Sequence, residues 1–132
     1  MNIKSLIIVG VLFVATSLLQ SCSCPESITK AESPSGRYAA EVSLEGKCGG
    51  ATVGYYTELA IHDKDEFSIL PRWNTIWQVR GDVPAQTSWR SANRLELRHA
   101  PLATPGAQVI FQTDRFRDIE VSYVSDPSLQ RK

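Results

Sequence analysis

The chain has 132 residues, with 14 basic and 14 acidic side chains and a formal net charge of zero. That length gives room for one globular domain, and the charge balance excludes the basic excess typical of nucleic-acid-binding proteins. Three cysteines and two histidines are present, but not in the paired spacing that builds zinc sites. We therefore expect one domain that has no metal site, no cofactor and no nucleic-acid partner.

The N-terminal segment has the features of an export signal. Lys4 precedes an uncharged, mostly apolar run over 6–19, which is short for a membrane span and has the length of a signal-peptide core. The run ends in Leu19-Gln20-Ser21-Cys22. This tetrapeptide resembles the lipobox of bacterial lipoproteins, in which the signal is cut before the cysteine and the thiol takes a diacylglycerol.

The lipobox resemblance implies a signal peptide over 1–21 and a mature chain that begins at a lipidated Cys22, with its new amine acylated, for example with palmitate. Two or three acyl chains hold a domain on a bilayer far better than one chain does. Lipoproteins of two-membrane bacteria that stay in the inner membrane commonly carry Asp after the lipidated cysteine. This chain has Ser23 there, which implies the outer membrane if the source has two membranes.

The cysteine count predicts a disulfide. Lipid on Cys22 leaves Cys24 and Cys48 as an even pair in an oxidising compartment, and a bridge between them would pin the tether to the domain. The functional alternative is a catalytic Cys48 with His62 or His99 as its base. That arrangement needs a third group to orient the histidine, and no sequence signature surrounds Cys48, so we favour the disulfide.

The stretch over 26–35 is polar, and we interpret it as a linker within a lipidated tether over 22–35. From Arg37 onward, apolar and polar side chains alternate with period two, typical of half-buried strands, and Gly, Pro and Asp mark the turns. The expected strands cover 37–44, 52–62, 75–79, a segment opening at Thr87 and Trp89, 94–99, a segment around Val109 and Phe111, and 118–124, with 67–70 as a further short candidate.

These segments predict a small all-β domain over 36–126. We expect strands 37–44 and 52–62 to form a hairpin with Cys48 in its connection, and 127–132 to be a loose polar tail. No mature stretch has a helical period. Seven to eight short strands with regular turn signals favour a small antiparallel sandwich or barrel-like domain.

Four short motifs follow one another along the mature chain. They are the Ser33-Pro34-Ser35-Gly36 opening, the Cys48-Gly49-Gly50-Ala51-Thr52 loop, Trp89 ahead of Leu95 and Leu97, and the segment 119–123. In this order they resemble a family of small, uncharacterised exported bacterial proteins. The resemblance implies a small all-β domain and transfers no catalytic residue.

Three sets of side chains are candidates for binding. Arg90, Arg94 and Arg98 recur every four residues and could bind an anion, but they could equally form a solvated strand face that pairs with Glu96 and Glu120. The tryptophans Trp73, Trp77 and Trp89 could form a carbohydrate platform, although core packing is the commoner role. His99 follows the inward side of Leu95 and Leu97, which indicates a strand-end histidine rather than a base.

Two classes of function follow from these observations. We expect a membrane-anchored lipoprotein, not an enzyme, that presents a β-domain for binding or for a structural role in the cell envelope, possible partners being envelope proteins. The alternative is a small envelope hydrolase or a secreted-type inhibitor. An exposed apolar patch would favour the first class, and a deep pocket lined by His99 or Asp82 would favour the second.

Overall fold

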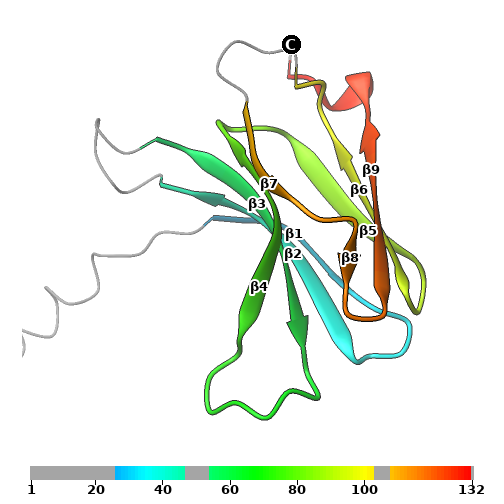
Figure 1. The fold of residues 1–132 in the computed structure, drawn as a ribbon. Coiled ribbons are helices and arrows are strands. Elements are labelled where there is room, and N and C mark those ends of the chain that lie inside the picture. Colours follow the sequence, from blue (N-terminus) through cyan, green and yellow to red (C-terminus); the bar gives the residue numbers. More distant parts are fainter. Residues whose placement is uncertain (1–25, 47–53, 103–107, 132) are drawn as a thin grey trace, which may run out of the picture.

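The computed structural model describes residues 26–46, 54–102 and 108–131, which form an all-β domain (Figure 1). The expected all-β fold is therefore confirmed. The strands are β1 (Glu26–Glu32), β2 (Tyr38–Glu45), β3 (Tyr56–Asp63), β4 (Trp73–Arg80), β5 (Ala85–Ser91), β6 (Arg94–His99), β7 (Gln108–Gln112), β8 (Arg115–Phe116) and β9 (Ile119–Ser125), followed by the 3-10 turn η1 (Pro127–Leu129).

The strands form two sheets that pack as a sandwich. One sheet has five strands in the order β1-β2-β3-β4-β7, and the other has four in the order β5-β6-β9-β8. Neighbouring strands are antiparallel except β6 and β9, which run parallel. β2 and β3 form the expected hairpin, paired from Tyr38 with Asp63 to Glu45 with Tyr56.

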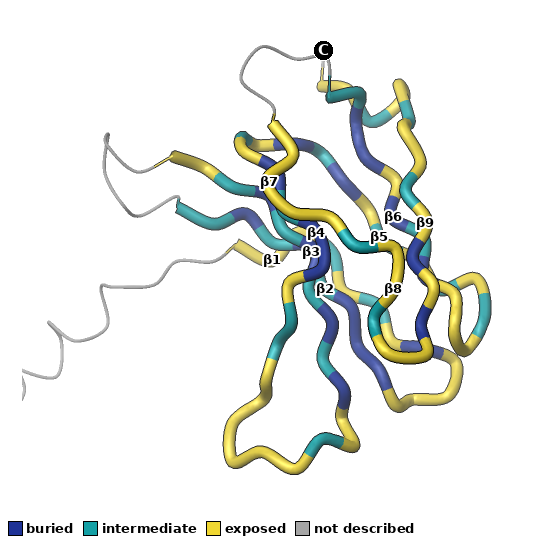
Figure 2. The backbone as a smooth tube through the Cα atoms, viewed as in Figure 1, coloured by how far each residue is buried: buried dark blue, intermediate teal, exposed yellow. Residues whose placement is uncertain are grey.

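The core lies between the two sheets, where dark blue segments face one another in Figure 2. Alternation along β3 places Thr57, Leu59, Ile61 and Asp63 on the buried side, because successive side chains of a strand point to opposite faces. Trp77 is fully buried at the centre of β4. Burial of this apolar surface is the main favourable contribution to folding.

The expected linker was wrong for 26–32, because these residues form strand β1. Its polar sequence shows no apolar alternation, since β1 is an edge strand that is largely exposed and is held by backbone pairing with β2. Main-chain pairing of this kind does not require apolar side chains. The domain therefore includes β1, and Glu26, the first described residue, is already paired with Leu44.

Three smaller expectations also need correction. The segment 67–70 is not a strand but the exposed part of the β3–β4 connection. β4 begins at Trp73 rather than at residue 75. The tail is not wholly loose, because Asp126 caps η1 through the Ser128 amide and Leu129 packs against the core.

Candidate functional site

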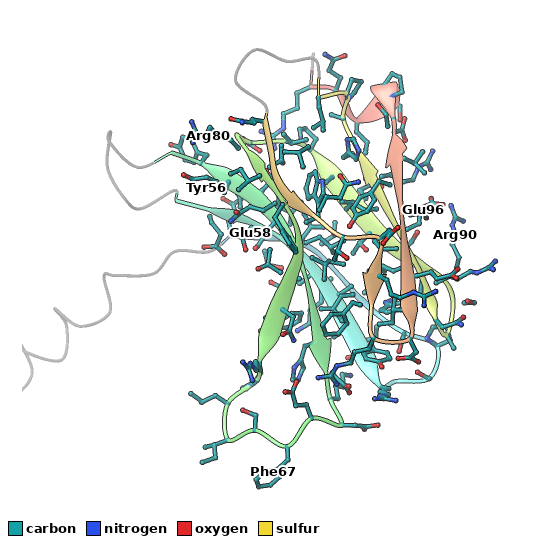
Figure 3. All side chains as sticks on the ribbon, viewed as in Figure 1. Tyr56, Glu58, Phe67, Arg80, Arg90 and Glu96 are labelled. Atoms are coloured by element: carbon teal, nitrogen blue, oxygen red, sulfur yellow. The ribbon has the colours of Figure 1, made fainter. Side chains whose placement is uncertain are left out.

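The β3–β4 loop carries the most exposed large apolar side chains of the described residues. Phe67, Ile69 and Leu70 are 99%, 96% and 74% exposed, and Figure 3 shows Phe67 pointing away from the sandwich. We call these three residues the apolar tip. Pro71, which follows them, suits a turn and lacks an amide donor. The tip thus presents apolar surface that the described domain does not cover.

The base of the same loop is organised around a buried carboxylate, Asp63, which is 1% exposed. The Arg37 guanidinium donates from Nε to Oδ1 at 3.2 Å and from Nη2 to Oδ2 at 3.1 Å. Arg117 donates to Oδ2, and the Asp65 amide donates to Oδ1 at 3.0 Å. The hydrogen bond from Arg37 holds the pKa of Asp63 below its usual value. Such charge-assisted bidentate pairing satisfies a buried carboxylate.

A second carboxylate extends this network along the loop. Glu66 pairs with Arg117 at 3.3 Å and with Arg72 at 3.8 Å. Arg117 lies in the turn between β8 and β9 and has a φ of 55°, a left-handed conformation uncommon for a residue with a side chain. Because Arg117 contacts both Asp63 and Glu66, it ties the four-stranded sheet to the loop of the other sheet. We call Arg37, Asp63, Glu66, Arg72 and Arg117 the clamp.

A tyrosine–carboxylate pair lies beside the clamp. The Tyr38 hydroxyl donates to Asp118, and the Arg37 guanidinium lies 4.9 Å from the centroid of the Tyr38 ring. Burial, with the Asp118 contact as a further cause, raises the pKa of Tyr38 to about 12, and the same hydrogen bond lowers the pKa of Asp118. These groups join β2 to the β8–β9 turn, which makes them structural links between the sheets.

The clamp was missed by sequence reasoning, although part of it was visible. Asp63 lies on the same, inward-facing side of the strand as Thr57, Leu59 and Ile61. Alternation alone would therefore have predicted a buried carboxylate at this position. The alternation of side chains could not have identified Arg117 as a cation that pairs with Asp63. Arg117 lies 54 positions away and depends on an unusual backbone conformation.

Each of the three candidate anion-binding arginines contacts a carboxylate. Arg90 forms two hydrogen bonds to Glu96, Arg94 lies 3.4 Å from Glu120, and Arg98 lies 3.1 Å from Asp126. Two of them share an open hollow of about 690 Å³ that sequence reasoning did not foresee; it is lined by Arg90, Arg94, Leu95, Asp114, Arg115, Glu120, Val121 and Ser122. Arg98 is not among its lining residues.

The two histidines occupy different surroundings. His99 is buried, with Nδ1 2.8 Å from the Ala100 carbonyl oxygen and its ring stacked on Trp77. His62 lies on the outer face of the five-stranded sheet beside Trp73. Neither lines one of the hollows described here. Cys22, Cys24 and Cys48, the predicted lipidation and disulfide positions, lie outside the described residues.

The three tryptophans do not form a common platform. Trp77 is in the core, and Trp89 packs against it from β5 with Nε1 donating to the Ala31 carbonyl at 3.1 Å. Trp73 lies on the outer face, opposite His62 in the strand pairing. The core interpretation therefore holds for Trp77 and Trp89, and Trp73 is half-buried on the outer face.

Asp82, named above as a possible pocket residue, lines an open hollow of about 300 Å³ near the start of β1. Its other lining residues are Glu26, Ile28, Leu44, Tyr55 and Arg131. Arg131 pairs with Asp82 at 3.0 Å. The hollow is open rather than deep, and His99 does not line it.

Comparison with known proteins adds no relative to these observations. No protein-family model, no curated protein and no solved structure matches the chain. In the ranges that the structure describes, no three His, Cys, Asp or Glu residues are grouped so that they could hold a metal ion. Within the same ranges, no helix is long and apolar enough to cross a membrane.

Proposed function

We propose that this protein is a lipid-anchored component of the bacterial cell envelope that binds a protein partner through its apolar tip. The observation that carries the proposal is the exposure of Phe67, Ile69 and Leu70, two of which are almost completely open to solvent. Apolar side chains scattered singly over a surface need no explanation, whereas a contiguous exposed group is typical of an interaction site. Aromatic and aliphatic anchors of this kind often dominate the energetics of an interface.

The clamp supports this interpretation because it fixes the loop on both sides of the tip. Asp63 and Glu66 precede Phe67, while Arg72 follows Leu70, and all three are joined to Arg37 or to one another through ion pairs. The Lys64 amide also donates to the Arg37 carbonyl at 2.8 Å. A loop that is already ordered loses less conformational entropy when it binds.

The position of the tip is compatible with anchoring at Cys22. Glu26 lies at the end of β2 that includes Leu44, whereas the β3–β4 loop leaves the opposite end of the sheet (Figure 1). Eight residues of β2 span about 27 Å. The four residue steps from Cys22 to Glu26 reach at most about 14 Å. Glu26 and the tip thus lie at opposite ends of the sheet, so an anchor close to Glu26 would leave the tip accessible.

The charge around the tip favours a protein partner over a lipid surface. The loop over 64–72 contains two basic and two acidic residues, so it has no net positive charge to attract anionic lipids. Juxtamembrane segments that bind such lipids carry clusters of Lys and Arg. An apolar cleft of another protein matches the uncharged Phe67–Ile69–Leu70 group better.

Site-specific photo-crosslinking in intact cells tests the proposal. A benzophenone amino acid replaces Phe67 in one variant and the exposed Gln86 of the other sheet in a matched control. We expect one discrete adduct from position 67 and none from position 86. Equal or absent adducts at the two positions would contradict a binding role of the tip.

The anchoring half of the proposal has its own test. Cys22→Ser is expected to abolish lipid labelling and to release the protein from the membrane fraction. If the variant stays membrane-bound and is processed at the same site, the lipobox interpretation is wrong. Density-gradient separation of the two membranes then checks the outer-membrane expectation based on Ser23.

A further inference from the structure

The cations around the base of the β3–β4 loop differ in how far the domain itself uses them. The guanidinium groups of Arg37 and Arg117 both donate hydrogen bonds to the buried carboxylate of Asp63. The Lys64 ammonium donates to Glu32 at 2.7 Å. These three cations therefore have close carboxylate partners within the chain.

Arg72, which follows Pro71 on the other side of the apolar tip, differs from them. Among the described residues, its one carboxylate neighbour within ion-pair distance is Glu66, whose Oε1 lies 3.8 Å from Nη1, too far for a hydrogen bond. Glu66 has a closer partner in Arg117, at 3.3 Å. The Arg72 side chain is 70% exposed, against 43% for Arg37 and 42% for Arg117. Arg72 thus keeps its guanidinium donors available.

The position of Arg72 is nevertheless fixed. Its carbonyl oxygen lies 2.9 Å from Nδ1 of His62 on β3, and the next residue, Trp73, begins β4 opposite His62. The contact with Glu66 places the guanidinium beside the residue that directly precedes Phe67. A cation with unused donors is therefore held at the edge of the apolar tip.

This arrangement has the two parts of a protein-binding surface. Apolar anchors at the centre of an interface supply most of the binding energy, and charged groups at the polar rim guide association and fix the register of the two surfaces. A guanidinium at the rim matches a carboxylate, because its planar fork donates two parallel hydrogen bonds to the two oxygens.

We propose that the protein partner of the apolar tip carries a carboxylate at the rim of its apolar cleft, and that this carboxylate accepts hydrogen bonds from Arg72. The inference rests on the proposed function and adds the charge of the surface that the tip recognises. An apolar cleft with a basic rim would be rejected, because like charges brought together at an interface oppose binding. Arg72 is thus a specificity-determining residue.

Photo-crosslinking in intact cells, with the benzophenone amino acid at position 67, tests this inference. Arg72→Glu should lower the yield of the protein adduct about tenfold, because repulsion replaces attraction at the rim. Arg72→Lys keeps the positive charge and should retain most of the adduct. The matched control is Arg80→Glu, a charge reversal at the other end of β4, which Figure 3 shows far from Phe67. It should crosslink as the parent chain does.

A compensating change in the partner separates direct contact from an effect on the loop. Mass spectrometry of the adduct identifies the partner segment, and reversing its nearest carboxylate to lysine should restore crosslinking by Arg72→Glu. Thermal unfolding of each purified variant checks that it is folded, and Arg72→Gln replaces Arg72→Glu if the latter is not.

The yield from the parent chain distinguishes this inference from the proposed function. A protein adduct that a folded Arg72→Glu or Arg72→Gln variant forms as well as the parent would overturn the inference alone. The same holds if Arg80→Glu loses as much adduct, or if no carboxylate reversal in the partner segment restores it. If the parent chain forms no protein adduct, or an adduct with lipid only, both the proposed function and the inference are wrong.

Discussion

At the base of the β3–β4 loop, a carboxylate is covered by two guanidinium groups, whereas at its tip three apolar side chains face solvent. Each half reverses the usual rule, since charged groups are normally exposed and large apolar groups normally buried. The base can be understood from the fold alone, because Asp63 finds all its partners within the chain. The tip cannot, because Phe67 and Ile69 find none among the described residues.

This difference separates stability from binding within a single loop. A buried carboxylate that loses its cations leaves a charge without a partner, and the folded state bears the cost. An exposed phenylalanine contributes little to folding, because it stays as accessible as in the unfolded chain. Substitutions at the base should therefore change stability, and substitutions at the tip should change binding.

The largest loss of stability is expected from removing the predicted disulfide, at the end of the sheet opposite the β3–β4 loop. The losses expected at the base of the loop are smaller. Glu26, two residues after Cys24, pairs with Leu44, four residues before Cys48. This is compatible with the Cα separation of under about 7 Å that a disulfide needs. Cys48→Ala should lower the free energy of unfolding by about 3 kcal/mol, measured by denaturant titration.

Mass spectrometry of the non-reduced protein is the control for that prediction. A mass two hydrogens below the reduced chain, with no alkylation of Cys48, is expected. A freely alkylated Cys48 in the native protein would contradict the disulfide and would revive the thiol-enzyme alternative.

Removing the central carboxylate of the clamp should be the next largest effect. Asp63→Ala is expected to destabilise the domain by about 2 kcal/mol, since it strands two guanidinium groups that can turn only partly toward water. Asp65→Ala is the control: this neighbouring carboxylate is exposed, and its pairing with Arg37 at 3.5 Å should contribute less than about 0.5 kcal/mol. Equal losses in the two variants would contradict a special role for Asp63.

Lowering the pH should reduce the difference in the free energy of unfolding between the parent chain and the Asp63→Asn variant. The pKa of Asp63 is lower in the folded state than the ordinary value of 3.8, so its stabilising contribution is complete above that value. The contribution is lost as the pH falls through the folded-state pKa, where both chains carry an uncharged group at position 63. Unfolding curves from pH 6 to pH 2 measure this convergence, and a constant difference would refute it.

The smallest stability effect is expected at the tip. Phe67→Ser/Ile69→Ser/Leu70→Ser should change the free energy of unfolding by no more than about 0.5 kcal/mol, because these side chains have almost no contacts to lose. With the photoreactive residue placed at position 68, the same triple variant should no longer form the crosslinked adduct with the partner. A large loss of stability would show that the loop packs on the domain.

Much of the fold could be predicted from alternation alone, because one side of each central strand is buried. The strand over 94–99 was predicted with its observed bounds, and the inward set Leu95, Leu97 and His99 is buried as expected. β1 escaped prediction because its side chains are mostly polar and exposed, so no apolar row marks it in the sequence. The two-residue β8 is too short to show a period at all.

The candidate site was less predictable for a different reason. The apolar residues over 67–70 indicate a strand when only the sequence is considered, since apolar side chains usually have a core to join. Their exposure depends on where the clamp holds the loop, and the clamp depends on pairing between residues as distant as Arg37, Asp63 and Arg117. Tertiary contacts of this kind leave no local signature.

The central claim is that a protein partner covers the apolar tip in the envelope. The most direct test compares the accessibility of a cysteine at the tip in the purified protein and in the intact envelope. The Ile69→Cys variant is treated with a maleimide that does not cross lipid bilayers but is small enough to enter the envelope. The parent chain is the blank. The control is Asn93→Cys, a variant in the exposed β5–β6 turn. The account predicts rapid labelling of both variants when purified, and selective protection of position 69 in the envelope. Equal labelling of the two positions in the envelope would contradict a partner bound at the tip.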